Sequence, residues 1–360
     1  MLNGLFSLFD GFALLPPPAQ YAFVIAFGLV IGSFVTVVVH RLPIMLERDW
    51  QTTVEAYLEE IQTGEASLTS DEPTSSSAPR SSASASFGSS VSSIVSTAPA
   101  SSTTSEPSAS ASQTSSTSIG GSAAPTAPAF NLMHPGSRCD ACGHVLRPWE
   151  NIPVISYLAL RGRCSACHAP IPARYPLIEL VTGLLAALAW WRFGPGWTAV
   201  FAFGFAAVAL ALTCIDWQTR LLPDSITLPL LWAGLIVNLG PTFTTLADAV
   251  IGAAAGYAFL WLIYWGFWWL RRVEGIGLGD LKLFAAIGAW LGWGALVQVL
   301  VLASLSGAAV GLALLALRRL RRDEPLAFGP FLAIAACITL FAGTPLWPAM
   351  ALHGTPGFGG

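Results

Sequence analysis

The sequence predicts an all-α protein that crosses a membrane about eight times. Of its 360 residues, 54% are hydrophobic and only 10% are charged, and the mean hydropathy is +0.63. Soluble domains carry about 25% charged residues, so this composition excludes a soluble globular class. Apolar stretches recur along the chain, and the basic residues gather in alternate connections between them. The net charge of -3 gives no indication of a nucleic-acid partner.

A helix needs roughly 20 apolar residues to span a bilayer, and eight stretches come near that length. The predicted spans are residues 20–40, 176–191, 197–215, 225–239, 248–270, 281–293, 295–317 and 327–350. The first lacks a basic leader region and an Ala-x-Ala cleavage site, so we expect a retained span rather than a signal peptide. We therefore divide the chain into an N-terminal segment with the first span (1–43), a loop (44–130), a cysteine module (131–175) and a seven-helix membrane domain (176–360).

The distribution of Lys and Arg predicts the orientation of these spans. Eight spans place nearly every basic residue in connections on one side, and only Arg192 falls in a connection on the other side. The residues on the basic side are Arg41, Arg138, Arg147, Arg161, Arg163, Arg174, Arg220, Arg271, Arg272, Lys282, Arg318, Arg319, Arg321 and Arg322. Basic connections face the cytoplasm, so both termini are expected outside.

The loop 44–130 contains two kinds of sequence. Residues 49–62 have apolar side chains at helical spacing and predict a short helix. Residues 66–128 are almost entirely Ser, Ala, Thr, Pro and Gly. Such a segment cannot bury enough apolar surface to offset its chain entropy, so we expect residues 66–128 to be disordered.

The cysteine module holds two Cys-x-x-Cys pairs with 21 residues between them. The pairs are Cys139 with Cys142, and Cys164 with Cys167. Two such pairs can present four thiolates to one tetrahedral zinc ion, and a module this small gains folding energy from the metal. Four protein ligands leave no open position, so the expected zinc is structural. Disulfides, free thiols and another metal are the alternatives, and a reducing cytoplasm disfavours disulfides.

Two histidines near the pairs and the two remaining cysteines have simpler expected roles. His144 and His168 lie beside the pairs and could replace a cysteine as ligand, although we expect both to be surface residues. Cys214 and Cys337 lie within apolar segments and are expected to pack in the membrane domain.

Two aspartates lie where predicted spans meet the cytoplasmic connections. Asp216 ends the third span, and Asp280 opens the sixth in Gly277-Leu278-Gly279-Asp280. A carboxylate at a membrane boundary is costly unless it is solvated, paired or used. Two of them on one side suggest a shared site, in which one ionised carboxylate activates water and one protonated carboxyl polarises a peptide carbonyl. Gly277 and Gly279 would let the backbone bend and a substrate strand approach.

Each acidic residue near a helix end also has a structural interpretation. Asp280 could cap its helix, whereas Asp216 lies at a C-terminal end, where the helix dipole opposes a negative charge. We expect Asp224 to be an N-cap of the fourth span, with an accessory role at the active site as the alternative. Asp248 is expected to cap the fifth span on the far side. Glu179 is expected in the first turn of the second span, where a negative charge is favourable, and an accessory role at the active site is the weaker alternative.

Further motifs connect these residues along the chain. They are Gly32-Ser33-Phe34 with Arg41-Leu42-Pro43; Asn151-Ile152-Pro153 with Ser156-Tyr157; Arg174-Tyr175-Pro176 with Glu179; Asp216 with Leu222-Pro223-Asp224; Thr227-Leu228-Pro229-Leu230-Leu231-Trp232; and Glu274-Gly275-Ile276-Gly277-Leu278-Gly279-Asp280. Together with the two cysteine pairs, in this order, they resemble the bacterial type IV prepilin peptidases, the leader peptidase/N-methyltransferases. These are membrane aspartyl proteases with a Gly-x-Gly-Asp motif.

The resemblance implies a function and its residues. Such enzymes cut the basic leader of type IV prepilins and type II secretion pseudopilins after a glycine, at the cytoplasmic membrane face. Many then methylate the new N-terminus with S-adenosylmethionine. The catalytic pair of the family maps onto Asp216 and Asp280, and its metal-binding cysteines map onto the two pairs here.

Two features depart from the family pattern. Thr36 stands where the family commonly has Asn, and the insert 66–128 is unusual, although it interrupts no matched motif. Two other classes remain as alternatives. A proton-coupled transporter with a zinc-ribbon loop would need its aspartates near the middle of the bilayer and often shows repeated halves. A zinc-ribbon scaffold protein with a membrane anchor would not need a pair of aspartates.

Overall fold

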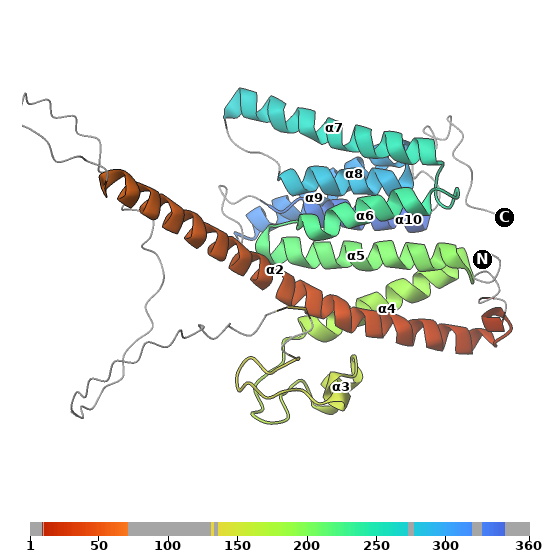
Figure 1. Ribbon diagram of the computed structural model, residues 1–360. Helices are drawn as coiled ribbons and strands as arrows, with labels where there is room; N and C mark the ends of the chain where they lie inside the picture. The colour runs from red at the N-terminus through yellow and green to blue at the C-terminus, as the bar shows by residue number, and fades with distance from the viewer. Residues whose placement is uncertain are drawn as a thin grey trace, which may run out of the picture. The chain divides into compact units, whose positions relative to one another are not determined.

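The computed structural model describes residue 9 and residues 11–70, 131–132, 136–272, 277–318 and 326–342. This part of the chain is helical, and its only β-pairings are isolated bridges. Figure 1 shows the helices α2 (Pro17–Ser70), α3 (Ile155–Ala159), α4 (Arg174–Phe193), α5 (Trp197–Thr219), α6 (Asp224–Val237), α7 (Leu246–Arg271), α8 (Leu278–Leu291), α9 (Trp293–Ala316) and α10 (Gly329–Ala342), and a 3₁₀ helix, η1 (Pro148–Asn151), precedes α3.

The predicted all-helical fold is confirmed. Each of the eight predicted spans overlaps one helix among α2 and α4 to α10. Five helices are long and apolar enough to cross a membrane, namely α2, α4, α5, α7 and α9, whereas α6 and α10 are shorter apolar helices. The short helix expected at 49–62 is helical as predicted, but it continues α2 without a break. Of the insert 66–128, residues 66–70 end α2, and the rest lies outside the described residues.

The chain separates into two compact units. One consists of residues 1–50 and 130–360, and the other of residues 51–129. Everything described below belongs to the first unit.

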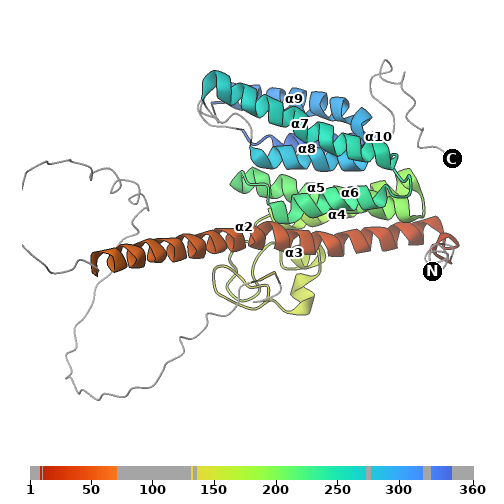
Figure 2. The same ribbon diagram turned by 45° about the horizontal axis from the view of Figure 1, so that its top comes forward.

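Helices α5, α8 and α10 carry most of the buried residues of the helical domain. Figure 2 shows α8 between α7 on one side and α5 and α6 on the other. Helix α8 is buried on nearly every side, from Asp280 to Trp290. A helix that is apolar all round belongs in such a core rather than against lipid or water. Cys337 packs against this core and Cys214 against a smaller cluster beside it, which confirms their predicted packing role.

Glycines let two helix pairs approach until their backbones touch. On α2, a Cβ at Gly28 or Gly32 would come within 2.7 Å of Ala186 Cβ or Glu179 Cα on α4. On α7, a Cβ at Gly252 would lie 2.6 Å from the carbonyl oxygen of Gly288 on α8. Small residues four apart are a common means of packing helices in membranes. Here they bring α2 against α4 and α7 against α8.

We predict that Gly252→Leu destabilises the membrane domain by about 1–3 kcal/mol or more, because the side chain must push α7 away from α8. The measurement is the thermal unfolding midpoint of the purified protein in detergent. Gly266→Leu is the matched control, since a Cβ at that position on α7 meets nothing within 4 Å. Equal midpoints for the two variants would contradict the close approach.

Candidate active site and metal centre

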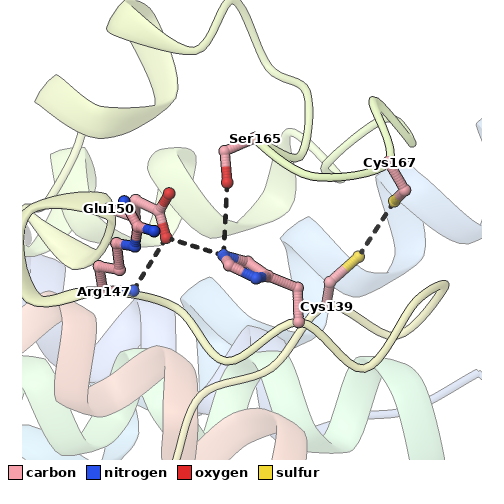
Figure 3. Close-up of polar contacts among 6 residues, drawn as sticks. Cys139, Arg147, Glu150, Ser165 and Cys167 are labelled. Carbon is pink, nitrogen blue, oxygen red and sulfur yellow. Dashed lines mark hydrogen bonds and ion pairs between the residues drawn. The ribbon is translucent and has the colours of Figure 1, made fainter.

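The four cysteines of the module come together as a candidate metal centre. The Sγ atoms of Cys139, Cys142, Cys164 and Cys167 all lie within 4.8 Å of one another, and Cys139 Sγ is 3.8 Å from Cys167 Sγ. Figure 3 shows Cys139 and Cys167 facing each other from separate loops. A tetrahedral zinc with Zn–S bonds of about 2.3 Å separates its sulfurs by roughly 3.8 Å. All six cysteines are free thiols, so the disulfide alternative does not describe this structure.

The two cysteine loops repeat one backbone design. Cys139 N–H donates to His144 O, and Cys164 N–H donates to Ala169 O, each at 2.9 Å. The residue after each second cysteine has positive φ, 71° at Gly143 and 57° at His168. The N–H of Cys167 faces the Cys164 sulfur and contributes most to lowering the pKa of that thiol to about 6. A lowered pKa favours the thiolate, which is the form that binds metal.

His144 belongs to a polar network beside the cysteines rather than to the four-sulfur cluster (Figure 3). Its Nε2 lies 3.2 Å from Glu150 Oε2 and 3.4 Å from Ser165 Oγ. The backbone N–H of Arg147 also donates to Glu150 Oε2 at 2.8 Å and contributes most to lowering the pKa of Glu150 to about 2. The expectation that His144 lies on the surface is thus only partly met, because it is half-buried. His168 is exposed, as expected.

The two aspartates are the buried acidic residues of the candidate active site. Asp216 lies in the last turn of α5 with 5% of its surface exposed, and Asp280 lies in the first turn of α8 with 7% exposed. Leu222 links their surroundings, because it lies against the Cβ positions of both Gly329, beside Asp216, and Gly279, which precedes Asp280. Asp216 Oδ2 is buried and has no hydrogen-bond partner among the described residues. A buried polar atom of this kind is costly and points to a functional use.

Leu222 and three glycines surround the pair. A Cβ at Gly279 would lie 2.7 Å from Leu222 Cβ, and a Cβ at Gly277 would lie 3.4 Å from Asp280 Oδ2. A Cβ at Gly329, the first residue of α10, would lie 2.5 Å from Asp216 Oδ2 and 3.0 Å from Leu222. We did not predict a role for Gly329. In the sequence, Gly329-Pro330 stands before an apolar stretch and looks like an ordinary helix start, so nothing marked Gly329 as part of the site.

Asp280 is not the N-cap residue of α8. Its backbone N–H donates to Gly277 O at 3.1 Å, and Gly277 is the N-cap residue, with no side-chain cap.

The prediction that Asp224 is an N-cap is wrong. Pro223 occupies the cap position of α6, and the Asp224 side chain makes no cap hydrogen bond. Instead Lys282 Nζ donates to both Asp224 carboxylate oxygens, at 2.7 and 2.5 Å. Lys282 follows Asp280 by two residues, so this ion pair joins the start of α6 to the start of α8, beside the aspartate pair.

Asp248 takes part in a cap at the start of α7. Its N–H donates to Thr245 Oγ1 at 3.1 Å, and the Thr245 hydroxyl donates back to its carboxylate at 2.7 Å. The cap residue itself is Thr245. The prediction that Asp248 caps this helix is therefore met in part, because Thr245 is the cap residue and Asp248 is its hydrogen-bond partner.

Glu179 and Thr36 lie where α2 meets α4. Because α4 begins at Arg174, Glu179 falls in its second turn rather than the first turn we expected. Its Oε2 accepts the N–H of Val154 at 2.8 Å. Thr36 is buried, and its hydroxyl donates to Gly32 O on its own helix at 2.9 Å. A hydroxyl satisfied in this way fits the helix interior.

Comparisons with known proteins assign the family. The model of the bacterial peptidase A24 N-terminal domain matches residues 26–193, and that of the type IV leader peptidase family matches residues 203–312. A prepilin leader peptidase/N-methyltransferase of Burkholderia pseudomallei is 49% identical over 337 residues, 93% of this chain and 90% of the relative. This chain belongs to the bacterial type IV leader peptidase family.

Other relatives in the family span the chain to a similar extent. Proteins of the same name from Aeromonas hydrophila and Pseudomonas aeruginosa are 42% and 39% identical, over 91% and 89% of this chain and 92% and 89% of their own lengths. No solved structure matches the chain. As a member of this family with five helices fit to cross a bilayer, it is a multi-pass membrane protein. The four clustered cysteines lie in the first matched region, and Asp216 and Asp280 lie in the second.

We predict that the purified leader peptidase holds about one metal ion per chain, as a four-thiolate site requires. Cys139→Ser should release the ion and expose residues 136–172 to proteolysis, because the module has little core of its own. Metal content by mass spectrometry and limited proteolysis measure both effects. Cys337→Ser, which removes a thiol outside the cluster, should keep the ion. A metal-free wild-type protein with a protease-resistant module would contradict the prediction.

Proposed function

We propose that this protein cleaves and then N-methylates prepilins and pseudopilins, and that Asp216 and Asp280 carry out the cleavage. The observation that carries the proposal is the burial of both carboxylates at adjoining helix ends, with one Asp216 oxygen left unpartnered. Two close carboxylates share one proton, because ionising both is costly. One can then activate water while the other donates to the scissile carbonyl.

The surrounding residues support this assignment of roles. Gly279 and Gly329 carry no side chain, which lets Leu222 pack against both and lets the start of α10 approach Asp216. Lys282 and Asp224 neutralise each other at the edge of the site, so the pair faces no unbalanced fixed charge from them. Gly277, the extended residue before α8, lets the chain turn into the helix next to Asp280. We assign Asp224, Gly277 and Gly279 supporting rather than chemical roles.

The site sits at one end of the helices, which favours a peptidase over the transporter alternative. Asp216 is three residues from the end of α5, and Asp280 is the third residue of α8. A transporter would hold such groups near the bilayer midplane. We propose that α2 and α4 to α10 form eight crossings of the bacterial cytoplasmic membrane and that the pair faces the cytoplasm. A leader cut there would leave the apolar part of the prepilin in the bilayer.

We propose that the four cysteines hold a structural zinc ion on the cytoplasmic side. The sulfur separations fit zinc, and a four-thiolate set leaves no position for a substrate. Zinc would supply folding energy to the module and take no part in cleavage.

We predict that Asp216→Asn and Asp280→Asn each reduce cleavage of a purified prepilin by at least about 100-fold, because one carboxylate cannot act as both base and acid. Asp224→Asn should keep most activity, since its exposed ion pair with Lys282 is worth about 0–1 kcal/mol. Asp248→Asn, at the far end of the helices, is the control. Mass spectrometry of the precursor gives the rates. Full activity of Asp216→Asn would overturn the assignment.

We predict that Gly329→Ala also reduces cleavage, by about 100-fold, because the added methyl group must displace the Asp216 carboxylate. Gly307→Ala is the matched control, since its Cβ would meet Phe331 only at an ordinary 3.5 Å. The rate with the same precursor is the measurement, and unfolding midpoints check that both variants are folded. Equal rates for the two variants would show that Gly329 does not shape the site.

A further inference from the structure

The cysteine module carries an exposed apolar face on η1 and α3. Trp149, Ile152, Ile155 and Leu158 recur at every third residue, and each leaves between 42% and 68% of its surface exposed. The 3₁₀ helix η1 packs against α3, so the four side chains belong to one local structure. Single exposed apolar residues are ordinary, but a group of this kind on a small module marks a surface that binds a partner or a membrane.

The charges next to this apolar face are basic. Residues 147–163 include three exposed arginines, Arg147, Arg161 and Arg163, and a single acid, Glu150. The Glu150 side chain is only 9% exposed and accepts the Arg147 N–H at 2.8 Å. A partner that lies on this face therefore meets apolar side chains bordered by positive charge, with no exposed carboxylate from the same segment.

Arg147 and Trp149 form a combination that suits the interface between membrane and water. The Arg147 guanidinium lies 5.5 Å from the centre of the Trp149 ring. Trp is enriched at this interface because its ring is apolar and its N–H is polar. A guanidinium held over such a ring can bind a phosphate while its stem stays over apolar surface.

The start of α3 lies against the part of α4 that enters the membrane. The N–H of Val154, the N-cap residue of α3, donates at 2.8 Å to Glu179, which belongs to the stretch 176–191 predicted as the second span. Leu177 and Leu180, close to Glu179 in the same helix, are exposed apolar residues. Figures 1 and 2 both show α3 alongside α2. The exposed side chains of α3 therefore lie at the level where α4 enters the lipid.

Contacts with α2 place α3 at the same level. Tyr157 of α3 lines a cavity together with Ser33 and Thr36 of α2, which belong to the stretch 20–40 predicted as the first span. Phe34, between those two residues, is 56% exposed, as expected of a side chain that faces lipid. Helix α3 is thus held against two membrane-spanning helices, and its exposed apolar side chains extend the lipid-facing surface of both onto the module.

We infer that the η1–α3 face of the module lies on the bilayer surface and that its three arginines bind anionic lipid headgroups. The apolar side chains enter the boundary between headgroups and acyl chains, and the arginines pair with the phosphates. A second copy of the chain fits this face less well, because the arginines of the two copies would repel each other. The inference uses the membrane-spanning helices and does not depend on the proposed cleavage or methylation.

The experiment places a photo-crosslinking residue in the full-length protein, held in lipid nanodiscs, as Leu158→p-benzoylphenylalanine. Ala166→p-benzoylphenylalanine is the matched control, since Ala166 is exposed on the second cysteine loop, outside η1 and α3. The discs contain phosphatidylcholine and phosphatidylglycerol in equal amounts. Both faces of a disc are open, so the result does not depend on which side the module occupies. Mass spectrometry identifies the crosslinked lipid or protein, and unfolding midpoints show that each variant is folded.

We expect about tenfold more lipid adduct from the probe at Leu158 than from the probe at Ala166, because only the first lies at the boundary of the bilayer. Phosphatidylglycerol should exceed phosphatidylcholine in the Leu158 adduct, and adding Arg161→Gln and Arg163→Gln should lower that excess while the adduct itself persists. Equal lipid adduct from the two probes, or a crosslink to a second copy of the chain in place of lipid, would overturn the membrane contact. Equal yields of the two lipids, or an excess that the arginine substitutions leave unchanged, would overturn headgroup binding.

Discussion

The cost of burying two carboxylates in an apolar helical domain constrains the rest of this structure. Asp216 and Asp280 are almost fully buried, and one oxygen of Asp216 has no partner among the described residues. Burying a charge is costly unless the charge is paired or hydrogen-bonded, so favourable packing elsewhere must offset this cost. The buried α8 and the glycine contact between α7 and α8 contribute such packing.

The aspartate pair and the cysteine module lie towards one end of the protein because of how α2 and α4 pack. Glycines at 28 and 32 let α2 lie directly on α4, and the resulting cluster also contains Ile215, the neighbour of Asp216. The cysteine module attaches to the same end, where Arg41 donates to the carbonyls of Asn131 and Leu132.

The sequence identified those residues whose chemistry follows from their residue type and spacing. The two Cys-x-x-Cys pairs predicted a shared cluster because two short loops can bring four sulfurs together, and the structure brings them within 4.8 Å. Asp216 stood out because a cap cannot explain an acid at a helix C-terminus. Every stretch that was predicted as a span from its apolar length forms a helix, although α6, α8 and α10 are shorter than a full crossing of the bilayer.

The sequence predictions were wrong or incomplete where the role of a residue depends on tertiary contacts. Asp224 has the sequence context of an N-cap, yet it pairs with Lys282, 58 residues away. Gly329 looked like an ordinary helix start, and its importance appears only once α10 is packed against Asp216. Val154 adopts a φ of 57°, and nothing in the local sequence marks this valine for positive φ.

The central claim is that Asp216 and Asp280 work as one unit rather than as two independent groups. The most direct measurement is the residual cleavage rate of the Asp216→Asn/Asp280→Asn double variant against those of the two single variants. If the carboxylates share one proton and one water, either loss disables the unit, and the double variant should be about as slow as each single one. Losses that multiply in the double variant would contradict the account.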